Sequence, residues 1–302
     1  MRTDLAGISL KNPLIAASGT FGFGQEFGEY FDPGILGAIA TKGLTLEPRM
    51  GNRGRRIHET PAGMMNSIGL QNPSVAVFIA EELPRMRSYG TEIIANVGGA
   101  GIEDYEEAIE LLEATDISII ELNISCPNVK EGGMAFGIRC SSARRIVRAI
   151  RRCCTKKLMV KLSPNAENIV DMAYTCAEEG ADALSLVNTF NALAIDIENR
   201  RPVFNNVTAG LSGPAIKPIA LRMVYEVAKA VDLPVVGIGG ISNWKDAVEY
   251  IMAGATAVQV GTANFVDPLT MPKIIEGMQL YMKREGIQNL SEIRGIIGGN
   301  HG

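Results

Sequence analysis

The chain has 302 residues and a mass of 32.3 kDa, and 46% of its residues are hydrophobic, so it can bury a large core and is neither disordered nor fibrous. Its 29 basic and 33 acidic residues give a net charge of −4, whereas a nucleic-acid-binding protein is usually basic. Every apolar run is shorter than the roughly 18 residues of a membrane-spanning helix. Charged residues and a proline interrupt the apolar stretch at residues 5–17, which argues against a signal peptide.

Short apolar runs recur along the chain and are predicted to be strands. Most of them lack alternation between polar and apolar residues, as expected for parallel strands that are covered on both faces. The eight runs are residues 14–17, 37–41, 93–97, 118–122, 158–162, 183–187, 235–238 and 257–260.

Longer amphipathic segments between these runs are predicted to be helices. Asn72 before Pro73 and Asn243 before Trp244 are typical helix starts, and Gly180 and Gly254 are typical ends. The basic residues of 144–157 are expected to form the solvated face of one helix. The clearest helical segments are residues 73–89, 104–114, 141–154, 166–179, 216–231, 244–253 and 268–283.

Eight consecutive β/α units predict a (β/α)8 TIM barrel, with residues 1–302 as a single domain. A doubly wound parallel sheet is the alternative. Segments 43–92, 123–157 and 188–234 are longer than a loop and one helix require. They follow the second, fourth and sixth strands, so in a barrel they are expected to form the lid and rim of the site.

Polar residues follow the predicted strands where each strand ends. One buried lysine at a strand end is ordinarily salt-bridged, but two lysines and three asparagines that each close a different apolar run are hard to explain by packing. In a barrel they converge on one mouth, where they predict a site for an anionic ligand. These residues are Ser18, Lys42, Asn96, Asn123, Lys161, Asn188 and Thr189.

Glycines end the last two strands, at Gly239-Gly240 and Gly261-Thr262. In barrels the loops after strands seven and eight often bind phosphate through backbone N–H groups. Ordinary tight turns would explain either pair alone. The glycines between residues 19 and 24 have the wrong spacing for a nicotinamide dinucleotide site.

The chain has five cysteines and two histidines. The odd number and the absence of a Cys-x-x-Cys pair argue against a disulfide framework and favour a reducing cytoplasm. No cysteine set fits a zinc ion or an iron–sulfur cluster, and no metal site is predicted. Cys126 follows the fourth strand by a few residues, so it is a candidate general base or nucleophile, although a lone cysteine is most often a small buried apolar residue. Cys140, Cys153, Cys154 and Cys176 are assigned to packing.

Segment 60–72 is rich in glycine and asparagine, so it is either a plain loop or a segment that binds a planar polar ligand. Taken together, the motifs resemble those of the dihydroorotate dehydrogenase family over nearly the whole chain. The matching stretches are 17–21 (ASGTF), 41–43 (TKG), 66–72 (NSIGLQN), 123–128 (NISCPN), 160–162 (VKL), 187–189 (VNT), 237–240 (GIGG) and 260–262 (VGT).

The resemblance implies oxidation of (S)-dihydroorotate to orotate on FMN, in pyrimidine biosynthesis. A cysteine in the base position looks like class 1, because class 2 has serine there and an N-terminal membrane helix. The sequence from Cys126 to Gly133 looks like subclass 1B. That form passes electrons to NAD⁺ through a partner subunit carrying FAD and a [2Fe–2S] cluster, with a homodimer of catalytic chains inside a heterotetramer.

The resemblance also implies a role for each matching residue, with Cys126 as the base that removes the C5 proton. Lys161 is implied beside the N1/O2 edge of the flavin. The implied substrate contacts are Lys42, Asn66, Ser67, Ile68, Gly69, Leu70, Asn123, Asn188 and Thr189. The implied FMN contacts are Ser18, Lys42, Gly43, Asn96, Asn123, Lys161, Val187, Gly213, Gly239, Gly240, Gly261 and Thr262.

Two alternatives remain at this point. One is the class 1A form, a dimer that passes electrons to fumarate. The other is a non-redox, phosphate-binding barrel such as an aldolase or a synthase, in which Lys161 would form a Schiff base. A flavoprotein is yellow, whereas an aldolase would be colourless.

Overall fold

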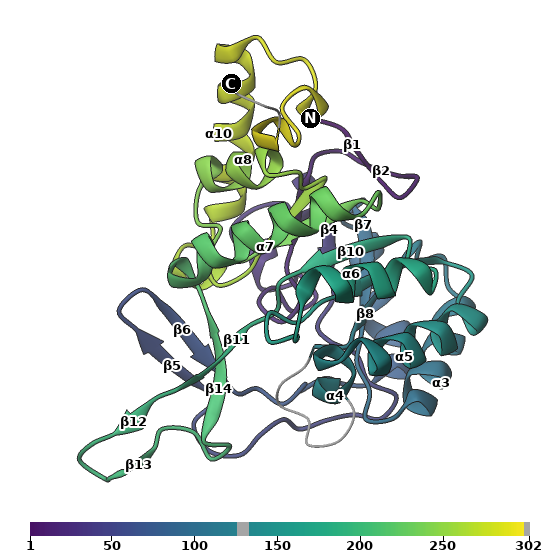
Figure 1. The fold of residues 1–302 in the computed structure, drawn as a ribbon, viewed down its shortest axis with the longest axis vertical. Coiled ribbons are helices and arrows are strands. Elements are labelled where there is room, and N and C mark those ends of the chain that lie inside the picture. Colours follow the sequence, from purple (N-terminus) through teal and green to yellow (C-terminus); the bar gives the residue numbers. More distant parts are fainter. Residues whose placement is uncertain (126–132, 299–302) are drawn as a thin grey trace.

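The structure is a computed structural model and describes residues 1–125 and 133–298. Eight parallel strands form a closed barrel in which each strand pairs with the next one along the chain (Figure 1). The barrel closes where Val258 of the last strand pairs with Leu14 of the first, so the alternative of an open, doubly wound sheet is wrong. The barrel strands are β3 (Leu14–Ala16), β4 (Ala38–Ala40), β7 (Glu92–Val97), β8 (Ile119–Asn123), β9 (Lys157–Lys161), β10 (Ala183–Leu186), β15 (Val235–Ile238) and β16 (Ala257–Val260).

Helices cover the outside of the barrel and pack on the outward side chains of its strands. Asn243 caps its helix and Gly180 and Gly254 follow helix ends with positive φ, as predicted. The main helices are α3 (Ile102–Glu113), α5 (Cys140–Cys153), α6 (Ile169–Glu178), α7 (Lys217–Ala230), α8 (Trp244–Met252) and α10 (Thr270–Glu285), and α4 (Gly133–Ile138) and α9 (Ala263–Val266) are shorter.

The prediction of one helix over residues 73–89 is wrong in detail. The segment contains α1 (Val75–Val77), a π-helical stretch (Phe78–Glu82) and α2 (Leu83–Arg87). Pro84 has no N–H to donate to the preceding turn, which explains the break. Asn72 is not the cap, because Ser74 Oγ accepts from the N–H of Val77, and Asn72 instead accepts from the N–H of Ser74.

The basic stretch lies mostly on α5, as predicted. Arg144 and Arg148 both pair with Glu179 beyond the end of α6, at N–O distances of 2.7 Å. Lys156 and Lys157 follow the end of the helix, and Lys157 begins β9, so the prediction is wrong for these two lysines.

An antiparallel hairpin closes the amino end of the barrel. It consists of β1 (Thr3–Leu5) and β2 (Ile8–Leu10). Leu5 and Leu10 are fully buried against the inward side chains of the strands. The apolar cluster at this end comprises Leu5, Leu10, Ile15, Ala38, Ala40, Ile94, Ile119, Met159, Ala183, Val236 and Ala257.

The long segments after the second and sixth strands form one antiparallel sheet that projects from the barrel (Figure 1). The sheet has the order β11-β14-β6-β5, and Asn66 of β6 pairs with Gly210 of β14. A second, two-stranded ribbon lies at the tip of the projection. The strands are β5 (Ile57–Thr60), β6 (Gly63–Asn66), β11 (Phe190–Leu193), β12 (Ile195–Asp196), β13 (Arg201–Pro202) and β14 (Thr208–Ser212).

Membrane-spanning segments were sought among the described helices. None of these helices combines the length and the apolar character that crossing a bilayer requires.

Candidate active site

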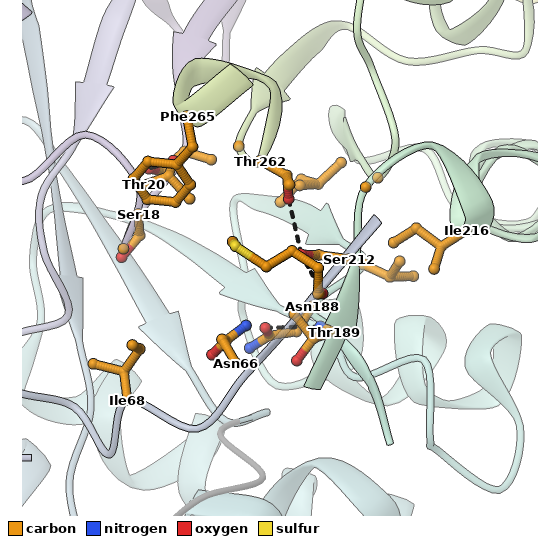
Figure 2. A pocket seen from close by; sticks show the side chains of 18 of the residues that line it. Ser18, Thr20, Asn66, Ile68, Asn188, Thr189, Ser212, Ile216, Thr262 and Phe265 are labelled. Carbon is orange, nitrogen blue, oxygen red and sulfur yellow. Dashed lines mark hydrogen bonds between the residues drawn. The ribbon is translucent and has the colours of Figure 1, made fainter. Parts of the chain in front are cut away.

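A cavity opens at the carboxyl end of the barrel, where the ends of the strands meet the projecting sheet. Figure 2 shows Asn66, Asn188 and Thr189 on one side of it, and Ser18, Thr20 and Phe265 on another. The cavity is thus bounded by residues from both ends of the chain and from two of the long segments. Its lining includes all the strand-end residues named above except Asn96.

Lys42 follows β4 and lines the cavity. Burial lowers the pKa of its amine below the ordinary value, and the nearby positive charge of Arg56 lowers it further. No ion pair among the described residues includes Lys42. An ammonium group without a carboxylate partner at a cavity wall is suited to binding an anion.

Lys161, at the end of β9, lies in a different environment. Its Nζ is 3.8 Å from Oε2 of Glu121, and both side chains are buried. Glu121 is on β8 with its side chain inside the barrel, because Ile119 and Asn123 point inward at a spacing of two residues. Its carboxylate also accepts from Asn96 Nδ2, from Ser185 Oγ at 2.7 Å and from Gln259 Nε2 at 2.8 Å.

A row of amides connects this interior to the cavity. Asn123 Nδ2 donates to Asn96 Oδ1 at 3.3 Å, and Asn123 Oδ1 accepts from Ser125 Oγ at 3.1 Å. Asn188 Nδ2 donates to Ser125 Oγ at 2.8 Å, and the N–H of Thr189 donates to Asn188 Oδ1. The amide side chains that line the cavity are therefore held by one another.

The two glycine-containing strand ends lie side by side on the cavity wall. Among the described residues, the backbone N–H groups of Gly240, Ile241, Gly261 and Thr262 donate to no protein acceptor. Gly240 has φ +67°, and a Cβ there would lie 2.9 Å from the carbonyl oxygen of Gly213, so only glycine fits. Several free N–H groups on a cavity wall are suited to phosphate.

The projecting sheet supplies part of the wall near these glycines. Thr262 Oγ1 donates to Ser212 Oγ at 2.8 Å, which joins the end of β16 to the end of β14 (Figure 2). Gly213 and Ile216 follow Ser212 along the same wall. The long segment after the sixth strand therefore contributes to the site itself, as the sequence predicted for its rim.

Most of the residues singled out from the sequence lie on the cavity. Asn96 is behind Asn123, and the buried Ser67 hydroxyl accepts from Asn52 and Asn206. Neither Asn96 nor Ser67 lines the cavity, and Cys126 lies outside the described residues. The predicted residues that line it are Ser18, Lys42, Gly43, Asn66, Ile68, Gly69, Leu70, Asn123, Lys161, Val187, Asn188, Thr189, Gly213, Gly239, Gly240, Gly261 and Thr262.

Sequence reasoning missed two kinds of residue. Glu121 stands in the middle of an apolar run, and a charged residue inside a buried strand is unusual, which is the one signal that could have found it. The cavity wall also contains residues to which the sequence reading gave no role. These are Ala17, Gly19, Thr20, Ile57, Met64, Ser212, Ile216, Ile238, Ile241, Ser242, Ala263 and Phe265.

Four cysteines were assigned to packing, and the structure agrees. Cys154 and Cys176 are buried, and burial raises the pKa of each thiol to about 12. The pKa of Cys153 is also raised by burial. Thiols that resist deprotonation are poor nucleophiles and poor bases.

Comparison with known proteins identifies the family. The family model described as dihydroorotate dehydrogenase matches residues 1–282. The chain is 63% identical over 296 residues to a Petrotoga mobilis protein named dihydroorotate dehydrogenase B (NAD(+)), catalytic subunit, covering 98% of this chain and 99% of that protein. Proteins of the same name from Geotalea uraniireducens and Thermoanaerobacter pseudethanolicus are 51% and 50% identical, with 98% of each chain covered.

These matches extend over nearly the whole chain, and the matched region contains every strand of the barrel and every residue of the cavity. The alternative of an aldolase or a synthase is therefore set aside. The chain belongs to the dihydroorotate dehydrogenase family.

Proposed function

We propose that this chain oxidises (S)-dihydroorotate to orotate in pyrimidine biosynthesis, as the catalytic subunit of an NAD⁺-linked enzyme. The observation that carries the proposal is the cavity itself. Within the described part of the chain, it brings together a lysine that has no carboxylate partner, a row of hydrogen-bonded amides and two strand ends whose N–H groups have no acceptor. The names of the relatives support the same reaction and the same acceptor.

The residues present fit FMN. The free N–H groups around Gly240 and Gly261 would hold its phosphate, because they have no acceptor among the described residues. Lys161 would lie beside the N1/O2 edge of the ring system, where a positive charge favours a reduced, anionic flavin. When bound, FMN supplies the acceptor for the hydride that leaves C6 of the substrate. The proposed contacts also include Ser18, Gly43, Val187 and Gly213. Asn96, which the resemblance also implies, lies behind Asn123 and would act through it.

Lys42 would bind the carboxylate of dihydroorotate. Its ammonium lacks a protein counter-ion among the described residues, so an anionic ligand would supply one. Asn66, Asn123 and Asn188 would form hydrogen bonds to the planar amide edges of the substrate ring. Such contacts would orient the ring so that the C5 proton points toward the base and the C6 hydrogen points toward the flavin.

Cys126 would remove the proton from C5 as a thiolate. The residue lies outside the described part of the chain, and its role is proposed from the motif at residues 123–128 alone. Ser125, the residue before it, is held at the cavity by hydrogen bonds to Asn123 and Asn188. The segment after Cys126, which lies outside the described residues as far as residue 132, is proposed from the same motif to close over the substrate and exclude water.

The remaining parts of the proposal concern the whole enzyme. Residues 1–302 would form one domain, and two such chains would pair within a heterotetramer. A partner subunit with FAD and a [2Fe–2S] cluster would pass the electrons to NAD⁺ in the cytoplasm. In contrast, a class 1A enzyme would need no such subunit and would reduce fumarate.

An anaerobic titration of the purified chain with dihydroorotate tests the half-reaction. We expect a spectrum of oxidised flavin that dihydroorotate bleaches, and little reduction of NAD⁺ until the partner subunit is added. Flavin that stays oxidised would contradict the proposed substrate. Efficient reduction of fumarate by the chain alone would contradict the proposed acceptor.

The variant Cys126→Ser tests the proposed base. Removing a positioned base typically slows proton transfer by about 10²- to 10⁴-fold. We therefore expect flavin to stay bound while its bleaching by dihydroorotate slows by this factor, measured by stopped-flow absorbance. Cys153→Ser is the matched control, since Cys153 lies on α5 and should leave the rate unchanged. An unchanged rate for Cys126→Ser at neutral pH would contradict the assignment.

A further inference from the structure

A buried carboxylate that the proposed mechanism does not use lies below the cavity floor. Glu121 has no exposed surface, and its hydrogen-bond partners in the described chain are all donors: Asn96, Ser185 and Gln259. A carboxylate can only accept hydrogen bonds. Gln259 turns its Nε2 toward Glu121 and leaves its own Oε1 buried without a partner among the described residues. The side-chain amides of Asn96 and Gln259 therefore both turn their NH₂ groups toward the carboxylate.

The hydrogen bonds of the amide row described above all run in one direction, from Asn188 to Glu121. Asn96 donates to Glu121, so its oxygen faces Asn123, and Asn123 must then offer its Nδ2 to Asn96. The oxygen of Asn123 consequently turns to Ser125, whose hydroxyl donates to it and accepts from Asn188. Every donor in the row points toward Glu121. The row is also held at its cavity end, because the backbone N–H of Ser125 donates to Asn123 Oδ1 at 3.3 Å. At the inner end only Glu121 holds the direction, since the Asn96 amide carries both a donor and an acceptor and could otherwise turn over.

We propose that Glu121 is a positioning residue that fixes the direction of this row, so that Asn123 offers an N–H rather than an oxygen to the bound substrate. Only one hydrogen of Asn123 Nδ2 is used by Asn96, and the side chain lines the cavity. The inference rests on the proposed function, because its ligand is the dihydroorotate or orotate ring. A reversed Asn123 would place an oxygen opposite an acceptor atom of that ring and leave both without a donor.

The test is the equilibrium dissociation constant of orotate, measured from the change in flavin absorbance of the purified holoprotein without turnover. We expect Glu121→Gln, which has the same shape but can both donate and accept, to weaken orotate binding about tenfold or more. Ser185→Ala is the matched control. It removes a donor from the other oxygen, Oε1, and leaves Oε2 with Asn96, so the dissociation constant should stay within about threefold of the wild type.

A double variant distinguishes a role of Glu121 in fixing the direction of the hydrogen bonds from a role in packing alone. In Glu121→Gln combined with Asn96→Asp, the new aspartate accepts from the glutamine on one side and from Asn123 on the other. The direction at Asn123 is then restored, and we expect orotate affinity to recover most of the loss. A purely structural role for Glu121 predicts that the double variant is weaker than the single one.

If Glu121→Gln does not retain flavin, Asn96→Ala performs the same test, because it interrupts the row and leaves Glu121 and Lys161 together. It should also weaken orotate binding. Equal affinity in wild type and in Glu121→Gln, or equal losses in Glu121→Gln and Ser185→Ala, would overturn the inference. A wild-type protein that binds flavin but no orotate would instead contradict the proposed function.

Discussion

The two ends of the barrel are built from the same eight strands but have opposite interiors. At the amino end, the β1–β2 hairpin inserts Leu5 and Leu10 among the inward apolar side chains of the barrel. Toward the carboxyl end, the next inward positions on β8 and β9 are occupied by Glu121 and Lys161, which are buried and form an ion pair. One strand, β8, shows the change by itself, since Ile119 lies in the apolar cluster and Glu121 lies two residues further on.

This contrast distinguishes the residues that stabilise the fold, at the amino end, from the residues that form the site, at the carboxyl end. Burying leucine at the amino end is favourable by itself. Burying a glutamate and a lysine is costly unless both are paired and hydrogen-bonded, and replacing such a pair with apolar residues is often neutral or stabilising. The polar layer therefore indicates a function for the carboxyl end, and the predictions below test whether stability and ligand binding divide between the two ends in this way.

The largest expected effect is on stability, from Leu10→Ala at the amino end. Leu10 is fully buried, and a buried Leu→Ala substitution typically costs about 2–5 kcal/mol of unfolding free energy. We expect this loss in urea unfolding, with flavin content and orotate affinity unchanged at low denaturant. Leu10→Met should cost less than about 1.5 kcal/mol, because it nearly preserves the volume. A parallel loss of orotate affinity in Leu10→Ala would contradict the division.

The sequence predicted the barrel well because its strands carry a strong local signal. Each is a short apolar run, such as Val235–Ile238, and in all but the third run a residue that lines the cavity lies at or next to the end of the run. Because the residues at the carboxyl ends of barrel strands meet at one mouth, the sequence alone predicted that Lys42, Asn123, Lys161 and Gly239 line one cavity.

The parts that the sequence did not predict depend on contacts between distant residues. The pairing of Asn66 with Gly210 joins two segments that look like unrelated loops, and it turns them into one sheet over the cavity. Glu121 was missed for a similar reason, since its significance lies in partners on four other strands. These are the donors Asn96 on β7, Ser185 on β10 and Gln259 on β16, and the ion-pair partner Lys161 on β9. No local pattern contains these relations.

The second effect concerns ligand binding at the carboxyl end. We expect Lys42→Met to weaken orotate binding about 10- to 100-fold, because a hydrogen bond to a charged group contributes about 1.5–3 kcal/mol. Protein stability should not fall, since burial already disfavours the charged amine. Lys11→Met is the matched control at the amino end, where Lys11 Nζ donates to the carbonyl oxygens of Gly34 and Gly90. It should lower thermal stability slightly and leave orotate affinity unchanged. A loss of orotate affinity in Lys11→Met, with unchanged affinity in Lys42→Met, would contradict the division of roles between the two ends.

The smallest expected effect is a shift in the pH dependence of orotate binding, which tests the proposed role of Lys42. Burial, and then the charge of Arg56, lower the pKa of Lys42. The orotate carboxylate binds the protonated amine, so affinity should fall as pH rises through this lowered pKa. Between the lowered pKa and the ordinary one, the unfolded chain binds more protons than the folded chain, so the same group makes the free energy of unfolding increase with pH.

Arg56→Gln removes the positive charge but keeps a donor for Gln71 Oε1, which Arg56 contacts at 2.7 Å. The pKa of Lys42 should then rise toward its ordinary value, and the loss of orotate affinity should move to higher pH. The shift should be small, because burial is the larger of the two causes. Orotate titrations of both proteins across the alkaline range measure it. A shift to lower pH would mean that the amine which responds to Arg56 is not the group that binds the orotate carboxylate.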